Sequence, residues 1–126
     1  MIEKILKIAK SESFSKTQRP GKAHVCACAI KGRTFWLGYN KQKSHPSAKR
    51  EYKHKGTESC FLHAEIDAIV KVPRDTRAKI KLFVFRFLKD GTLSMAKPCD
   101  MCQNYLKQQG IKNVIYTNWG GQWTRL

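Results

Sequence analysis

Two short motifs place side chains that bind soft metals in separate parts of this chain. His63-Ala64-Glu65 lies near the middle, and Pro98-Cys99-Asp100-Met101-Cys102 follows far downstream. Zinc binds histidine nitrogen and cysteine thiolate readily, and a catalytic zinc keeps three protein ligands and one open position. A lone CxxC is weak support for a metal site, but HxE followed by PCxxC is much more specific. The fold must therefore bring these two regions together.

The spacing within each motif predicts how the ligands would meet. Cys99 and Cys102 are three residues apart, so on the first turn of a helix they point to the same side. His63 is expected at the start of another helix, and two facing helix N-termini would both favour thiolates. Glu65 is not needed as a ligand and is left free to carry protons. Three ligands, one open position and one adjacent carboxylate predict a hydrolytic site.

Two other zinc arrangements stay open at this point. A closed structural zinc site would need a fourth ligand, and Cys60 and His54 are the candidates. Such sites usually contain two CxxC-like pairs, whereas this chain has one, which disfavours the closed site. Cys60 with His45 or His54 could also hold a second, structural zinc.

Hydrophobic periodicity predicts a single domain, residues 1–126, of alternating helices and strands. An amphipathic helix is expected at the N-terminus, followed by a hairpin of two strands. A helix from His63 that is limited by Pro73, a strand, a helix that begins at Pro98 and ends at Gly110, and two short strands complete the order. The predicted strands are 24–30, 33–39, 80–87, 114–116 and 122–126.

Charge and cysteine content limit the partners and the compartment. Lysine and arginine number 25 against 9 acidic residues, a net charge of +16, which predicts attraction to phosphorylated substrates or polyanions. Residues 41–56 are predicted to form a basic loop. The five cysteines are an odd number and form no disulfide framework, which favours a reducing compartment. With no apolar run of membrane-spanning length, we expect a cytoplasmic protein, in the host cell cytoplasm if a phage encodes it.

Several other residues have ordinary structural interpretations. Cys26 and Cys28 lie in an apolar strand and are expected to be small buried side chains. Trp119 and Trp123 could stack on bases, but packing beneath the last hairpin or at a subunit interface is favoured. We expect a homo-oligomer.

The motifs resemble those of a known enzyme superfamily. His63-Ala64-Glu65-Ile66-Asp67-Ala68-Ile69 and Pro98-Cys99-Asp100-Met101-Cys102 are similar to the two zinc motifs of the cytidine and deoxycytidylate deaminases. Gly38-Tyr39-Asn40 is similar to a strand end whose asparagine contacts the substrate there. The resemblance covers roughly residues 1 to 117 and is greatest to small phage-type members.

The resemblance implies a fold and a set of roles. The fold is α/β, a three-layer α/β/α sandwich around a mixed five-stranded sheet. His63, Cys99 and Cys102 would hold Zn²⁺, and Glu65 would be the proton shuttle. The residues expected to contact the substrate are Asn40, Val25, Ala27, Ala64 and Lys97.

Three departures weigh against an adenosine substrate. Lys97 stands where tRNA adenosine deaminases have a glutamate before Pro-Cys. The basic insertion between Asn40 and His63 is longer than in those enzymes. No helix is expected after Tyr116, so the last strand should be antiparallel, as in small-molecule cytidine deaminases.

The favoured function is a zinc-dependent hydrolytic deaminase that converts cytosine to uracil in a nucleotide, dCMP to dUMP above others. One alternative is deamination of cytosine in single-stranded DNA or RNA, which would use the same chemistry and make sense of the charge. Another is a zinc-stabilised nucleic-acid-binding module without catalysis, which Glu65 disfavours. The charge is spread along the whole chain, which favours the small nucleotide.

Overall fold

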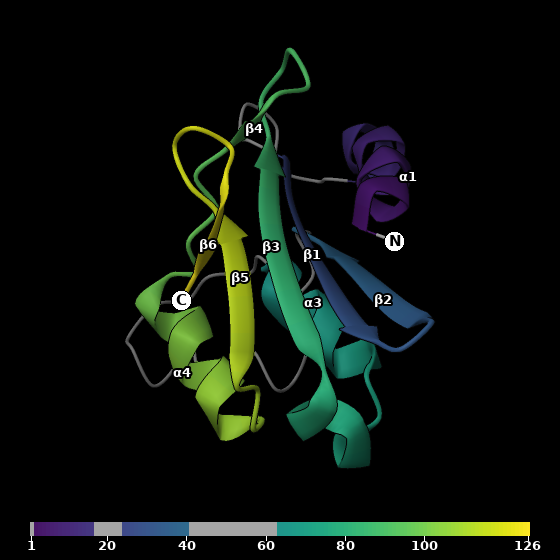
Figure 1. Cartoon of the computed structure of the whole chain (residues 1–126), viewed down its shortest axis with the longest axis vertical. Helices are drawn as coiled ribbons and strands as arrows, with labels where there is room; N and C mark the ends of the chain where they lie inside the picture. Colours follow the sequence, from purple (N-terminus) through teal and green to yellow (C-terminus); the bar gives the residue numbers. More distant parts are fainter. Residues whose placement is uncertain (1, 17–23, 41–62) are drawn as a thin grey trace.

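The structure of the chain is a computed structural model that describes residues 2–16, 24–40 and 63–126 (Figure 1). The predicted basic loop therefore lies outside the described residues. The helices and strands follow the expected order. They are α1 (Ile2–Lys16), β1 (His24–Lys31), β2 (Thr34–Tyr39), α3 (Ala64–Lys71), η1 (Arg74–Lys79), β3 (Lys81–Phe87), β4 (Leu93–Ser94), α4 (Asp100–Gln108), β5 (Asn113–Thr117) and β6 (Trp123–Arg125).

The strands form one mixed sheet in the order β2-β1-β3-β5-β6, and β4 pairs with β3. β1 is antiparallel to both β2 and β3, whereas β3 and β5 run parallel with α4 between them in the chain. β6 is antiparallel to β5. The mixed sheet and its antiparallel last strand are confirmed.

Helices cover both faces of the sheet and enclose two apolar clusters. Alternate residues of β1 point to opposite faces, as the pleat requires. Ala27 and Ala29 pack with Ile66 on the face covered by α3 and α4. Cys26 and Cys28 pack with Ile5 and other residues on the face covered by α1. In Figure 1, α3 lies behind β1 and β3, and α1 lies beside them. The three-layer architecture is confirmed.

The two strand cysteines are buried small side chains, as predicted. Both are fully buried. Burial raises the pKa of the Cys28 thiol to about 12, because an apolar environment disfavours the thiolate. Neither cysteine belongs to the cluster of metal-binding side chains.

A direct backbone contact fixes α3 on the sheet. Gly38 in β2 faces the first turns of α3, and a Cβ placed there would lie 2.4 Å from the Ala64 carbonyl oxygen and from the Ala68 nitrogen. The buried Asp67 carboxylate accepts a hydrogen bond from the Tyr39 amide at 3.0 Å. Asp67 also pairs with Lys71 at 3.4 Å. These contacts set the position of the helix that carries His63 and Glu65.

Two short elements differ from expectation. η1 forms the connection between Pro73 and β3. β4 is a two-residue strand that pairs with the C-terminal end of β3. Both depend on tertiary contacts rather than on a local pattern: the Arg77 side chain of η1 donates to the Val72 carbonyl and to the Gln109 side chain. In the described ranges, no helix has the length and hydrophobicity needed to cross a membrane.

Gly38→Ala is expected to destabilise the protein strongly. The added methyl group would overlap backbone atoms of α3, which cannot move aside as a flexible side chain can, and overpacking costs typically about 1–3 kcal/mol. The matched control is Gly120→Ala, whose Cβ would meet only the Asn118 side-chain oxygen at 3.5 Å. Chemical denaturation of both variants checks the prediction. Equal stabilities would contradict the close-approach argument.

Candidate metal centre and active site

The N-terminus of α3 supplies a histidine and a carboxylate. His63 is the residue before the helix, in an extended conformation, and its carbonyl accepts the Asp67 amide at 3.0 Å. Glu65 lies in the first turn and is 4% exposed. The side chain of His63 is half-buried. A buried carboxylate beside an imidazole is thus placed at the end of the helix that Gly38 and Asp67 fix.

The N-terminus of α4 supplies two thiols. Cys99 immediately precedes the helix and is exposed, whereas Cys102 is buried in the first turn. Pro98 is buried, and its carbonyl accepts a hydrogen bond from the Gln103 side chain at 2.8 Å. The Gln103 amide donates to the Cys99 carbonyl at 2.9 Å. These bonds hold the segment that enters the helix, so the two sulfurs share one side as predicted.

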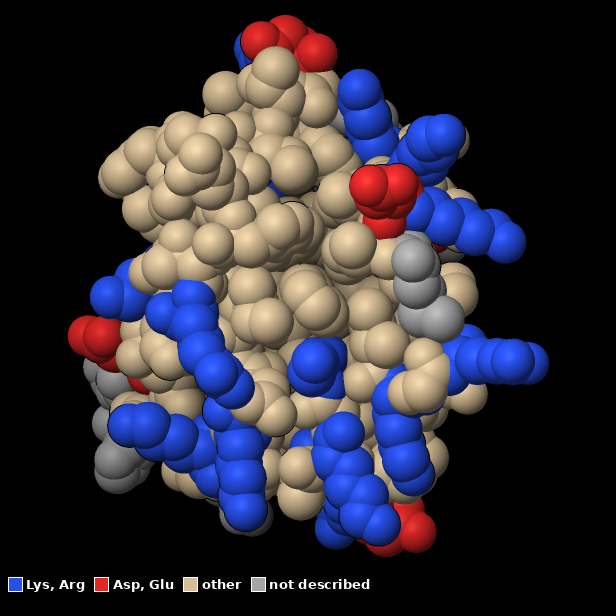
Figure 2. Space-filling view, in the orientation of Figure 1, with Lys and Arg blue, Asp and Glu red and all other residues tan. Residues whose placement is uncertain are grey.

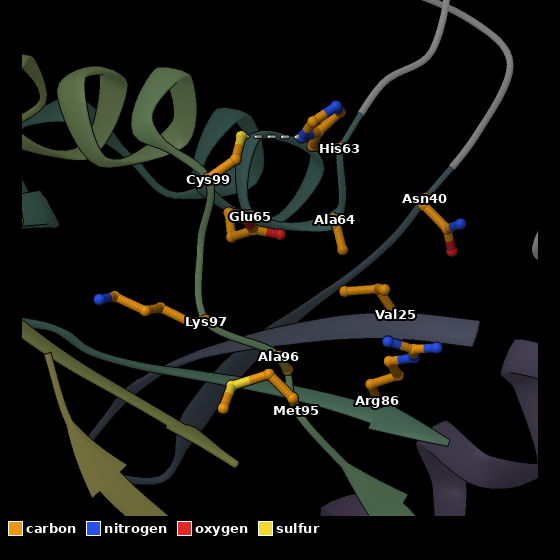
Figure 3. A pocket seen from close by; sticks show the side chains of 10 residues that line it. All are labelled: Val25, Asn40, His63, Ala64, Glu65, Arg86, Met95, Ala96, Lys97 and Cys99. Atoms are coloured by element: carbon orange, nitrogen blue, oxygen red, sulfur yellow. Dashed lines mark hydrogen bonds between the residues drawn. The ribbon is translucent and has the colours of Figure 1, made fainter. Parts of the chain in front are cut away.

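The three side chains converge on one point. His63 Nδ1 lies 3.1 Å from Cys102 Sγ. It lies 3.7 Å from Cys99 Sγ (Figure 3). All three ligand atoms lie within 4.8 Å of one another. Tetrahedral zinc with Zn–S of about 2.3 Å and Zn–N of about 2.0 Å separates such atoms by about 3.6 Å. The donor set and its spacing fit a zinc ion.

The site lowers the pKa of one thiol and raises the pKa of the other. A hydrogen bond from Cys102, assisted by His63, lowers the pKa of Cys99 to about 4 against the effect of burial. The pKa of Cys102 is raised, first because it donates to Cys99 and then because it is buried. One thiolate and one thiol therefore share a proton beside the imidazole. A bound divalent metal would favour the deprotonated form of both.

Glu65 faces the same cluster. Burial raises the pKa of its carboxyl, and the nearby His63 and a hydrogen bond with the Cys102 thiol partly offset that effect. Burial and a specific neighbouring charge are typical of groups that exchange protons in active sites. Glu65 is thus placed to move protons next to the ligand cluster.

The cluster opens into a cavity of about 320 Å³. This volume lies at the small end of the range for ligand pockets. Figure 3 shows its described lining residues. They are Val25, Asn40, His63, Ala64, Glu65, Arg86, Met95, Ala96, Lys97 and Cys99.

Most of the residues predicted from the sequence meet at this cavity. Val25, Asn40, Ala64 and Lys97 line it together with Glu65 and two of the three metal-binding side chains. Cys102 is buried behind them. Ala27 is not among the described lining residues, and its contact with the substrate stays a prediction. Ala27 follows Val25 by two residues on the same face of β1, about 7 Å further along the strand, and is fully buried in the core beneath α3.

Sequence reasoning missed three lining residues: Arg86, Met95 and Ala96. Met95 and Ala96 directly precede Lys97, so their place follows once the PCxxC motif is placed. Arg86 had a signal of its own, since it is a charged residue within the otherwise apolar run from Leu82 to Phe87. The alternative ligands Cys60, His45 and His54 lie outside the described residues.

Comparison with known protein families also identifies a zinc-binding region in this chain. Residues 1–118 match the zinc-binding region of the cytidine and deoxycytidylate deaminases. The chain belongs to this family. It is therefore a hydrolase of the class that acts on the cytosine amidine, with a zinc-binding region. No curated protein matches it by sequence.

Solved structures share the fold at low identity. Cytidine deaminase from Burkholderia pseudomallei has a TM-score of 0.65 and 16% identity, covering 100% of this chain and 92% of that one. The dCMP deaminase from cyanophage S-TIM5, in complex with dCMP and dUMP, has a TM-score of 0.54 and 23% identity, covering 93% and 80%. Cytidine deaminase from Mycobacterium leprae has 0.56 and 15%, covering 95% and 88%.

Purified without chelators, the protein is expected to contain one zinc ion per chain. Cys102→Ala should lose most of this metal, because one of three convergent ligand atoms is removed. Cys28→Ala is the matched control, since it removes a buried thiol outside the cluster and should keep the zinc. Elemental analysis by mass spectrometry measures both. A zinc-free wild type, or equal loss in the control, would contradict the site.

Proposed function

We propose that this protein converts dCMP to dUMP by zinc-dependent hydrolytic deamination. The observation that carries the proposal is the position of Glu65. It is a buried carboxylate next to three convergent metal-binding side chains, and it lines the same cavity. A metal site whose role is only structural has no need of such a carboxylate.

His63, Cys99 and Cys102 are the residues that would hold the zinc. When bound, zinc supplies activation of the attacking water and electrostatic stabilisation. Glu65 takes the proton of the water as it adds to C4 of cytosine and delivers it to the ring nitrogen. The second proton comes from the hydroxyl now attached to C4 and passes through Glu65 to the amino group. The C4–N bond then breaks, ammonia leaves and C4 becomes the carbonyl of uracil.

Three features support a free deoxynucleotide as the substrate. The cavity is small, about 320 Å³, which suits a single pyrimidine nucleotide. The net charge of +16 attracts anionic substrates. One solved structure of the same fold is named as a dCMP deaminase in complex with dCMP and dUMP. Cytoplasmic location, in a host cell for a phage-encoded protein, is an expectation that accompanies this substrate.

Homo-oligomer formation is part of the same proposal. At the β5–β6 end of the sheet, Trp119 is 74% exposed, and Trp123 and Leu126 are also exposed. Trp123 packs edge-on against Phe83 and Phe85, so only part of it is used within the chain. Exposed aromatic side chains at one end of a sheet are typical of subunit contacts.

Deamination of cytosine in single-stranded nucleic acid is the second candidate, and surface charge favours it. Figure 2 shows lysine and arginine side chains gathered over the lower part of one face, where Figure 1 places η1 and the end of α4. Exposed basic residues of this region are Arg74, Lys79, Lys81, Lys107 and Lys112. Lys107 lies about 12 Å along α4 from the ligand end, so these charges do not converge on the cavity.

A product-resolved assay separates the candidates. The zinc-containing protein is incubated with cytosine, cytidine, deoxycytidine, CMP, dCMP, dCTP and a cytosine-containing single strand. Conversion of dCMP above the others supports the proposal. Conversion of the oligonucleotide without conversion of dCMP would overturn it, and binding to that strand should then fall with salt at a log–log slope of about −0.7 per phosphate contacted.

Glu65→Gln should keep the zinc and the fold but lose about 10²–10⁴-fold in turnover, because the proton carrier is gone while the size of the side chain is retained. The matched control is Asp75→Asn, which neutralises an exposed carboxylate in η1 and should leave turnover unchanged. Steady-state kinetics with parallel zinc analysis measures both. A Glu65→Gln variant with near-normal turnover would assign the proton transfers to another residue.

A further inference from the structure

Arg86 is a charged side chain on an otherwise apolar stretch of strand. Leu82 and Val84 of β3 point into the core beneath α3 and α4. Arg86 is the next residue on that face, since side chains alternate along a strand. Its backbone pairs with Val25 of β1 and with Ser94 of β4, so it occupies a central position in the sheet. The guanidinium is thus carried to the cavity rather than to solvent at an edge.

Arg86 is partly buried, and one nitrogen of its guanidinium is not compensated by the described residues. Its Nε is buried and has no hydrogen-bond partner among the described residues. Val25, Met95 and Ala96 line the same cavity, and the only carboxylate among its described lining residues is Glu65. Glu65 lies at the end of the cavity that is next to Cys99 and His63 (Figure 3). A buried N–H of a charged group without a partner is costly, which makes such a group in a cavity a candidate for ligand binding.

Arg77 of the same chain shows what a structural arginine looks like here. It is 8% exposed, and its guanidinium donates to the Val72 carbonyl and to the Gln109 side chain. These partners join η1 to α3 and α4. Arg86 has no comparable pairing in the described part of the chain, which distinguishes it from an arginine that only holds the fold together.

The place of Arg86 in the cavity defines what it would meet. In Figure 3, Arg86 and Asn40 lie on the side away from Cys99 and Lys97, with Val25 and Ala64 between. The amino group of cytosine must approach Glu65 and the metal-binding cluster for hydrolysis. The rest of the nucleotide then extends toward Asn40 and Arg86.

We infer that Arg86 binds the 5′-phosphate of a nucleoside monophosphate and makes the site select nucleotides over nucleosides. This inference rests on the proposed function. A guanidinium stays charged in proteins and presents paired N–H donors that match two phosphate oxygens. A phosphate would supply the acceptor that the described residues do not give the Nε of Arg86.

Arg86→Gln tests the inference, with Lys81→Gln as the matched control. Lys81 is an exposed cation on the same strand, so its loss lowers the net charge equally without touching the cavity. Arg86→Gln should raise KM for dCMP about 10- to 100-fold, the range for losing a hydrogen bond between charged groups, and leave kcat/KM for deoxycytidine within about twofold. The control should change neither.

Product binding gives a readout that needs no turnover. Titration calorimetry on the zinc-containing protein should show that Arg86→Gln weakens dUMP by the same factor and leaves deoxyuridine unchanged. Arg86→Lys, which keeps the charge but not the paired donors, should weaken dUMP by a smaller factor. It also replaces Arg86→Gln as the test if that variant does not fold.

The outcomes separate the inference from the proposed function. A wild type that binds dUMP and deaminates dCMP, with Arg86 variants that weaken nucleotide and nucleoside equally or neither, overturns the inference alone. A wild type that binds dUMP without deaminating dCMP overturns the proposed function, and the inference is then decided by the binding data. A wild type that does neither overturns both.

Discussion

The approach of β2 to α3 at Gly38 is the contact on which the site depends. With only a hydrogen at this position, the backbone of α3 lies directly against the strand. The Asp67 carboxylate then reaches the Tyr39 amide, which lies next to Asn40 at the cavity wall. The end of β2 and the start of α3 are therefore held in fixed positions relative to each other. The distance between Asn40 and the pair His63 and Glu65 follows from this packing.

The metal-binding cluster joins two helix N-termini that the sheet places near each other. α4 lies between β3 and β5 in the chain, and parallel pairing of these strands puts its start at the same edge as the start of α3. Partial positive charge from both ends favours the thiolates of Cys99 and Cys102. A metal ion held by His63, Cys99 and Cys102 would link α3 to α4. Metal binding should thus contribute to the free energy of unfolding as well as to chemistry.

The sequence predicted those parts of the structure that depend on local pattern. Alternation identified the strands, and HxE with PCxxC identified the metal-binding side chains because zinc ligation restricts residue type and spacing. β4 was missed because two residues carry no periodicity, and their pairing with Arg86 and Phe87 is set by the tertiary fold. Ala27 lies on the same face of β1 as the cavity-lining Val25, but the face alone does not fix how far along the strand a cavity extends.

Arg86 illustrates how a ligand site and stability are coupled in a small domain. A guanidinium whose Nε is buried without a partner among the described residues should lower the stability of the ligand-free chain, since its hydration is only partly replaced. An anion that binds the folded state alone returns stability by mass action, about 2.7 kcal/mol at 100 times its dissociation constant. The residue that would select a phosphorylated substrate would thus also raise the free energy of unfolding when that substrate is present. A neutral side chain at position 86 would avoid this desolvation cost but would also lose the stabilisation by a bound phosphate.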